Sequence, residues 1–139
     1  MRNFRILSSI LLLFLGLVSF SSCSWEGGSG NGYVLSECLV GEPWIRTKVL
    51  FYEGGRSSEK KESPKEMVFF ENGDYEEYNG YGASYYGDWS LGSGMLSVDL
   101  YDYYAYYTTY KYEVESYSPT SLVLSYYSQD CLIEEYYKR

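Results

Sequence analysis

Short runs of β-branched and aromatic residues, separated by turn signals, fill the chain from Trp44 to its last residue. Apolar and polar positions alternate within many of these runs, as at Leu96, Val98 and Leu100. A period of two residues is typical of strands with one buried face, and no run sustains the 3.6-residue period of a helix. The pattern therefore predicts strands. These are eight in number, at 44–53, 66–71, 74–78, 84–91, 95–101, 108–117, 121–128 and 131–138.

The segments between these runs carry residues that favour turns. Asn72-Gly73 is a strong signal for a two-residue hairpin, and Gly92-Ser93-Gly94 and Ser118-Pro119-Thr120 also favour chain reversal. The longest connection, 54–65, mixes lysines and arginine with glutamates, which indicates a solvated loop without strand structure. Short connections of this kind predict an antiparallel meander.

A meander of about eight strands can close into an up-and-down β-barrel and so lose its exposed edges. The sequence therefore predicts an all-β fold with an eight-stranded antiparallel barrel over residues 33–139. An open two-layer sandwich is the competing architecture.

Alternation also predicts which side chains face the barrel interior. In the strand 84–91, Trp89 and Leu91 are the large apolar residues, whereas Asp88 strongly prefers water. Their face is therefore the inner one. The same reasoning gives a set of interior residues that are also the candidate ligand-binding positions. They are Phe69, Tyr85, Trp89, Leu91, Leu96, Val98, Leu100, Tyr110, Tyr112, Val114, Leu122, Leu124 and Tyr126.

The N-terminal segment has a different pattern. Arg2 and Arg5 precede an apolar run over 6–18, and small residues then lead to Cys23. Charge, a short apolar core and small residues in that order are typical of a secretion signal, here residues 1–22. A cysteine at the processing point resembles the lipobox of bacterial lipoproteins, which implies lipid attachment at Cys23. The alternative is a plain signal peptide with a cysteine nearby by chance.

A lipidated Cys23 implies a location in the bacterial cell envelope, on the periplasmic or surface face of the outer membrane. Membrane contact would then pass through the N-terminal lipid. Residues 23–32 are rich in glycine and serine and are expected to form a flexible tether to the domain.

Two further cysteines lie near the two ends of the domain, Cys38 and Cys131. Outside the cytoplasm two such thiols tend to pair, so a Cys38–Cys131 disulfide is expected. Two buried free thiols are the alternative.

Charge and composition exclude several functions. The chain has a formal net charge of −8, and its two leader arginines are not matched by any acidic residue there, so the mature chain is more acidic still. Such a protein would be repelled by nucleic acids. It contains no histidine, the commonest general base and metal ligand. We therefore expect no enzymatic activity, no metal and no cofactor.

Several short motifs over Gly41–Arg139 resemble the lipocalin-like domains of secreted bacterial lipoproteins. They are Gly41-Glu42-Pro43-Trp44, Phe69 to Gly73 followed by Tyr75, Gly87-Asp88-Trp89-Ser90, a late Tyr-x-Val strand followed by Leu-Val-Leu, and the terminal Lys138-Arg139. The resemblance implies an up-and-down barrel with an internal cavity, in which Arg139 covers Trp44. It implies no particular ligand.

Two functions stay open on the sequence. The 19 tyrosines include doublets such as Tyr126-Tyr127, and a strand places one ring of a doublet inside and one outside. Inner rings predict a carrier for a small apolar or amphipathic ligand, unless they merely fill the barrel. Outer rings on an acidic exterior predict a module that binds a protein or glycan, for example a basic enzyme to be inhibited.

Overall fold

The computed structural model describes residues 32–101 and 107–139, and these form a single antiparallel sheet with one short helix. The predicted signal peptide, the lipid-attachment residue Cys23 and all of the tether but Gly32 lie outside the described residues. The strands are β1 (Trp44–Glu53), β2 (Arg56–Glu59), β3 (Lys65–Phe69), β4 (Asp74–Asn79), β5 (Ser84–Gly92), β6 (Met95–Tyr101), β7 (Tyr107–Tyr117), β8 (Ser121–Ser128) and β9 (Cys131–Lys138).

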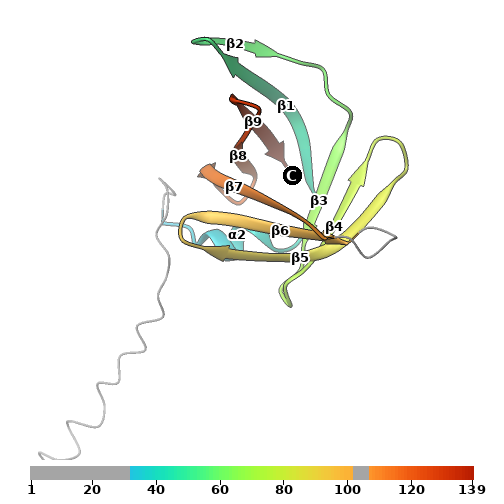
Figure 1. Ribbon diagram of the computed structural model, residues 1–139. Helices are drawn as coiled ribbons and strands as arrows, with labels where there is room; N and C mark the ends of the chain where they lie inside the picture. Colours follow the sequence, from blue (N-terminus) through green and yellow to red (C-terminus); the bar gives the residue numbers. More distant parts are fainter. Residues whose placement is uncertain (1–31, 102–106) are drawn as a thin grey trace, which may run out of the picture.

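Eight of these strands close into a barrel, as predicted (Figure 1). From β3 to β9 each strand pairs with the next along the chain. β1 completes the circle because it pairs with β9 over Ile45–Tyr52 and with β3 at Trp44 and Ile45. The fold is thus a closed, antiparallel up-and-down barrel. The eight predicted strands match the observed ones to within two residues at each end.

The ninth strand, β2, corrects the prediction that 54–65 is entirely loop. It pairs with the end of β1, from Glu53 opposite Arg56 to Leu50 opposite Glu59. Gly54 and Gly55 both have positive φ, 57° and 77°, which is the geometry of a tight hairpin turn. All four β2 residues are exposed, so this strand can carry charged side chains at no cost of burial. Mixed charge indicated solvation correctly, but solvation does not exclude an exposed strand.

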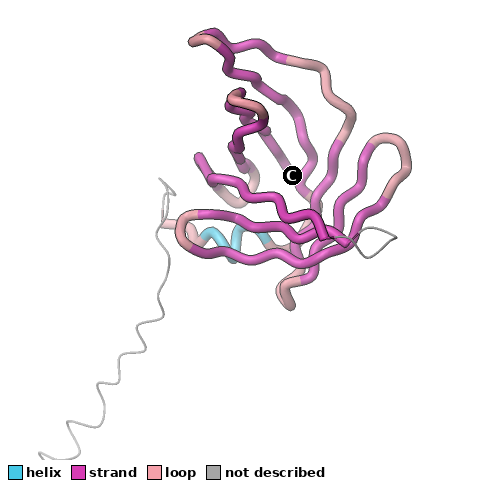
Figure 2. The backbone as a smooth tube through the Cα atoms, viewed as in Figure 1, coloured by secondary structure: helices cyan, strands magenta, loops and turns pink. Residues whose placement is uncertain are grey.

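A short helix, α2 (Leu35–Leu39), precedes the barrel and was not predicted (Figure 2). Its residues Leu35, Cys38 and Leu39 are buried in the barrel core. The indole nitrogen of Trp44 donates to the carbonyl of Leu39 at 3.0 Å and so fixes the helix to the first strand. At five residues the helix is too short to produce a periodic signal in the sequence.

The two ends of the barrel differ. We call the closed end the one where β1 begins and β9 ends, with the turns at 70–73, 93–94 and 118–120. We call the opposite end, with the turns at 54–55, 80–83 and 129–130, the open end. The helix lies at the closed end, where Trp44, Phe69, Leu96 and Leu122 are fully buried. This half of the barrel is therefore filled by side chains.

The expected disulfide is absent, and Cys38 and Cys131 are free thiols. Cys131 begins β9 at the open end, whereas Cys38 lies at the closed end, where its carbonyl accepts a hydrogen bond from Arg139. The length of β9 separates the two, on the order of 25 Å at the usual rise per residue. A disulfide requires Cα atoms within about 7 Å. The prediction was wrong because Cys38 belongs to a helix that covers the closed end.

Candidate functional site

Most of the residues predicted to face inward do so. Seven are buried in the core, and four more are partly buried against it. The buried ones are Phe69, Leu96, Val98, Leu100, Tyr112, Leu122 and Leu124; the partly buried ones are Trp89, Leu91, Val114 and Tyr126. Asp88 is exposed, as the predicted register requires.

Tyr85 and Tyr110 are the two members of that list that are exposed. Both belong to the inward face by alternation, but they are 36% and 43% exposed. The barrel is not filled at the open end, so inward residues there meet solvent. Tyr110 still lines an internal pocket, stacked on Tyr112 with ring centroids 6.5 Å apart, whereas Tyr85 does not line it.

Two tyrosine doublets divide between the two faces of the sheet as predicted. Tyr137 is fully buried inside the barrel, whereas its neighbour Tyr136 bonds to Glu134 on the outside. Tyr126 packs edge-on against Tyr112 inside, at 5.5 Å between ring centroids, whereas Tyr127 is 73% exposed. The inner rings contribute to both the core and the pocket wall.

A pocket of about 250 Å³ opens into the barrel at the open end; we call it the luminal pocket. Its wall combines tyrosine rings with charged and polar side chains. The lining residues are Arg46, Ser63, Pro64, Lys65, Glu77, Asn79, Tyr110, Tyr112, Tyr126 and Glu135. Tyr75 and Tyr137 are buried, and their hydroxyls donate to Glu77 and Glu135 respectively.

One side of the luminal pocket is closed by residues 60–64, which we call the strap. β1 and β3 pair only at Trp44 and Ile45, so the strap passes the stretch of β1 that β3 leaves unpaired. Arg46 Nη2 donates to the carbonyl of Ser63 at 2.5 Å and holds the strap against the barrel. A larger hollow of about 500 Å³ lies between the strap and β1, but exposed side chains of the strap form much of its wall. The luminal pocket is the better candidate site because its wall includes the buried side chains of Tyr112 and Glu135 and is otherwise mostly part-buried.

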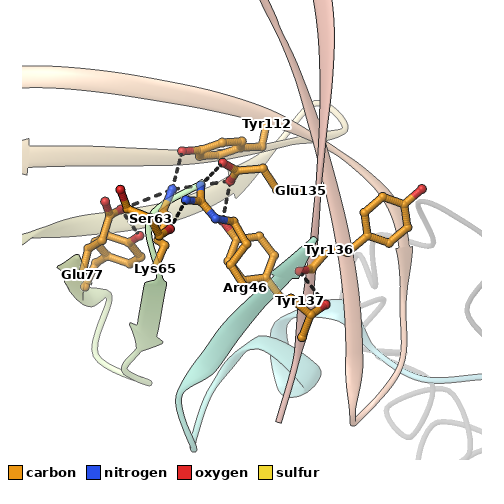
Figure 3. A network of polar contacts seen from close by, with 10 residues as sticks. Arg46, Ser63, Lys65, Glu77, Tyr112, Glu135, Tyr136 and Tyr137 are labelled. Atoms are coloured by element: carbon orange, nitrogen blue, oxygen red, sulfur yellow. Dashed lines mark hydrogen bonds and ion pairs between the residues drawn. The ribbon is translucent and has the colours of Figure 1, made fainter. Parts of the chain in front are cut away.

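Four charged side chains meet inside the barrel, and we call them the luminal cluster: Arg46, Lys65, Glu77 and Glu135 (Figure 3). Arg46 Nη1 lies 2.6 Å from Glu135 Oε1. Lys65 Nζ lies 3.5 Å from a carboxylate oxygen of both Glu77 and Glu135. Two cations thus balance two anions. Burying charges is costly unless they are paired in this way.

Tyrosine hydroxyls complete the hydrogen bonds of the luminal cluster. Tyr75 donates to Glu77 at 2.7 Å, Tyr137 donates to Glu135, and Tyr112 accepts from Lys65 at 3.4 Å. No buried side-chain nitrogen or oxygen among the described residues lacks a partner. The cluster is therefore a unit in which each buried polar atom has a partner, rather than a chance group of charges.

Burial and charge act in opposite directions on these groups. Burial would raise the pKa of Glu135, but Lys65, the hydrogen bond from Tyr137 and Arg46 together hold that pKa below its ordinary value. Burial would lower the pKa of Lys65, but Tyr112, Glu135 and Glu77 outweigh it and raise the pKa. Burial raises the pKa of Tyr112 to about 12, although Lys65 opposes this shift. Arg46, Lys65 and Glu135 are therefore charged at neutral pH.

The sequence interpretation missed the luminal cluster, although a signal was present. Ile133, Glu135 and Tyr137 alternate with Leu132, Glu134 and Tyr136, and the first set is the buried one. Alternation could therefore have placed Glu135 inside, opposite to Glu134. The Glu134-Glu135 pair does point to opposite faces, as expected, and forms no carboxylate dyad.

Aromatic rings and paired charges are the groups that the luminal pocket presents. Among the described residues no group of three or more acidic, cysteine or histidine side chains is placed to hold a metal ion. The described part of the chain also contains no helix that is both long and apolar enough to cross a membrane. What the site offers is a small cavity with aromatic walls and a few fixed polar groups.

No protein family, curated protein or solved structure matches the chain.

Proposed function

We propose that this protein binds a small amphipathic molecule in the luminal pocket and performs no chemistry on it. The observation that carries the proposal is the pocket of about 250 Å³ between Tyr110, Tyr112, Tyr126 and the luminal cluster. Ligand sites combine apolar and aromatic walls with a few polar groups that fix orientation. The filled closed end and the paired charges supply a rigid floor, which lowers the entropic cost of binding.

Pocket size restricts the ligand. Drug-sized ligands occupy about 300–1,000 Å³, so about 250 Å³ suits a molecule of only two or three rings, with part of it reaching the mouth. Three tyrosine rings in the wall favour a flat aromatic body.

Binding of N-phenyl-1-naphthylamine, an uncharged aromatic fluorophore, tests this proposal. We expect saturable binding with a blue-shifted emission that Tyr110→Ala weakens about tenfold, because Tyr110 lines the pocket and its partial exposure makes the substitution tolerable. Tyr127→Ala is the matched control, since that ring is equally large but lies outside. Equal loss in both variants, or no saturable binding, contradicts the proposal.

We further propose that the protein is a lipoprotein of the bacterial cell envelope, with the lipid attached to Cys23. Support comes from the charge, apolar run and small residues that precede this cysteine. In a lipoprotein-processing bacterial host, Cys23→Ala should abolish membrane anchoring and the acyl mass while the barrel still folds. Unchanged membrane partition of the variant contradicts the lipid anchor without affecting the luminal site.

A second candidate function rests on the outer face of β4–β7. Strand register aligns Asp74, Asp88 and Asp99 in one row across β4, β5 and β6. The next row across the strands contains Tyr86, Tyr101 and Tyr107. Like charges directly opposite one another are destabilising, which favours a cationic partner that would neutralise them. This is the acidic, tyrosine-rich exterior expected of a module that binds a basic protein.

Binding of a lysine-rich peptide tests the second candidate. Affinity should fall with rising salt, and Asp88→Asn should weaken it while leaving fluorophore binding in the luminal pocket unchanged. Glu71→Gln, which removes a carboxylate outside these rows, is the control. A peptide that binds both variants equally contradicts the second candidate.

A further inference from the structure

Lys65 is the least satisfied member of the luminal cluster. An ammonium has three N–H donors, and charge-assisted bonds are normally about 2.7–2.9 Å long. Among the described residues, Lys65 Nζ makes one hydrogen bond, to the hydroxyl of Tyr112 at 3.4 Å, and both carboxylates lie at 3.5 Å. Its donating capacity is thus under-used at a point that lines the luminal pocket.

Arg46 differs from Lys65 in this respect. Its guanidinium makes short contacts to Glu135, at 2.6 Å, and to the carbonyl of Ser63, at 2.5 Å. Figure 3 shows the Lys65 nitrogen between Glu77, Glu135 and Tyr112. Its contacts to these groups, at 3.4 and 3.5 Å, are longer than those of Arg46. Lys65 is therefore the group that gains most from an added acceptor.

The charge of that acceptor is limited by its surroundings. A ligand carboxylate beside Lys65 would also approach Glu77 and Glu135, which lie 3.5 Å from the same nitrogen. A ligand ammonium would meet the charges of Lys65 and Arg46. Because the luminal cluster is already balanced, either ion would place an unpaired charge in a poorly solvated site.

We infer that the luminal pocket selects an uncharged planar aromatic molecule whose hydrogen-bond acceptor, such as an amide or ketone oxygen, binds Lys65 Nζ. This inference rests on the proposed function and specifies its ligand class. The aromatic body would lie among Tyr110, Tyr112 and Tyr126, and the acceptor would shorten the contacts that Lys65 now makes at 3.4 Å or more.

Calorimetry with four indole compounds of similar shape tests the inference. Indole-3-acetamide, indole-3-acetate and tryptamine differ mainly in charge, and 3-methylindole lacks the acceptor. For the wild-type protein we expect the acetamide to bind about tenfold more tightly than each of the other three. Equal or tighter binding of the acetate or of tryptamine overturns the inference, as does equal binding of 3-methylindole or failure of all four to bind.

Two variants assign the selectivity to Lys65. Lys65→Met leaves the cluster with one excess negative charge, so tryptamine should become the tightest ligand. Because that variant leaves Glu77 unpaired and risks misfolding, the double variant Lys65→Met/Glu77→Gln restores balance. In it the acetamide should lose its advantage over 3-methylindole, and a retained tenfold advantage overturns the role of Lys65.

The wild-type measurements also separate this inference from the proposed function. Saturable luminal binding of N-phenyl-1-naphthylamine together with no preference for the acetamide overturns only the ligand class. Absence of binding for the fluorophore and all four indoles overturns both.

Discussion

The guanidinium of Arg139 lies over the indole ring of Trp44, with Cζ 4.3 Å from the ring centroid. The same guanidinium donates to the carbonyls of Cys38, Val40, Glu42 and Pro119. It therefore joins the last residue of the chain to the helix, the lead-in to β1 and the turn between β7 and β8. The contact that the lipocalin-like resemblance implied for these two residues is present in this barrel.

Arg139→Ala should destabilise the barrel by about 2–3 kcal/mol, because it removes a stacked cation and leaves several carbonyls without a donor. Arg139→Lys should recover only part of this, since an ammonium cannot reproduce the planar fork of donors. Lys138→Ala is the control, because that side chain is exposed. Urea unfolding measures all three, and equal stability of Arg139→Ala and Lys138→Ala contradicts the account of the closed end.

Glu135→Gln should cost about 3 kcal/mol, because it leaves Arg46 without its ion-pair partner inside the barrel. Glu134→Gln provides a matched control one residue away, on the outer face, where the glutamine oxygen can still accept the hydrogen bonds from Tyr52 and Tyr136. We expect a cost below about 1 kcal/mol there. Similar costs for the two variants would mean that the luminal cluster does not stabilise the fold.

Acid should remove the contribution of Glu135. Its pKa is lowered in the folded state, so between that value and the unfolded value of about 4.3 the unfolded chain binds more protons. The contribution of Glu135 to the free energy of unfolding is therefore fully present above that unfolded value and falls as the pH drops towards the folded pKa. The free energy of unfolding of Glu135→Gln should vary less over this range than that of the wild type.

Alkaline pH should destabilise the folded protein through ionisation of Tyr112. Burial raises its pKa to about 12, whereas an unfolded tyrosine titrates near about 10. The folded state binds more protons between these values, so stability is fully present below about pH 10 and is lost as the pH rises towards about 12. Tyr112→Phe should show a shallower loss over this interval. An identical slope for variant and wild type contradicts the buried position of the hydroxyl.

Free thiols predict that a reducing agent will not change the melting temperature. Cys131 should react with a thiol reagent faster than Cys38, because Cys38 is buried in the core and burial raises its pKa. Time-resolved labelling of the native protein, followed by mass spectrometry, compares the two rates, and labelling of the unreduced, unfolded protein counts the free thiols. A protein that resists labelling until it is reduced would contain a disulfide and contradict the placement of α2.

Alternation predicted the barrel well, because each strand has one apolar face and its side chains must share the same interior. It failed where local sequence carried no periodic signal. The five residues of α2 are too few to show a helical period. The sequence therefore did not reveal that Cys38 belongs to a helix at the closed end, and the disulfide expected for it was wrong. Tyr85 and Tyr110 were placed on the correct face, but the sequence does not show how far along the barrel the filling extends.

The luminal cluster was missed for a different reason. Charged residues were expected to face solvent, as they usually do. Arg46, Lys65, Glu77 and Glu135 come from four different strands, and their mutual compensation becomes visible only when the strands are closed. Pairing among residues far apart in sequence is what makes their burial possible.

Intermolecular nuclear Overhauser contacts between N-phenyl-1-naphthylamine and the isotope-labelled protein test directly whether the ligand binds in the luminal pocket. We expect contacts from the fluorophore to the rings of Tyr110, Tyr112 and Tyr126. Contacts confined to the outer rings of Tyr86, Tyr101 and Tyr107 would contradict this expectation.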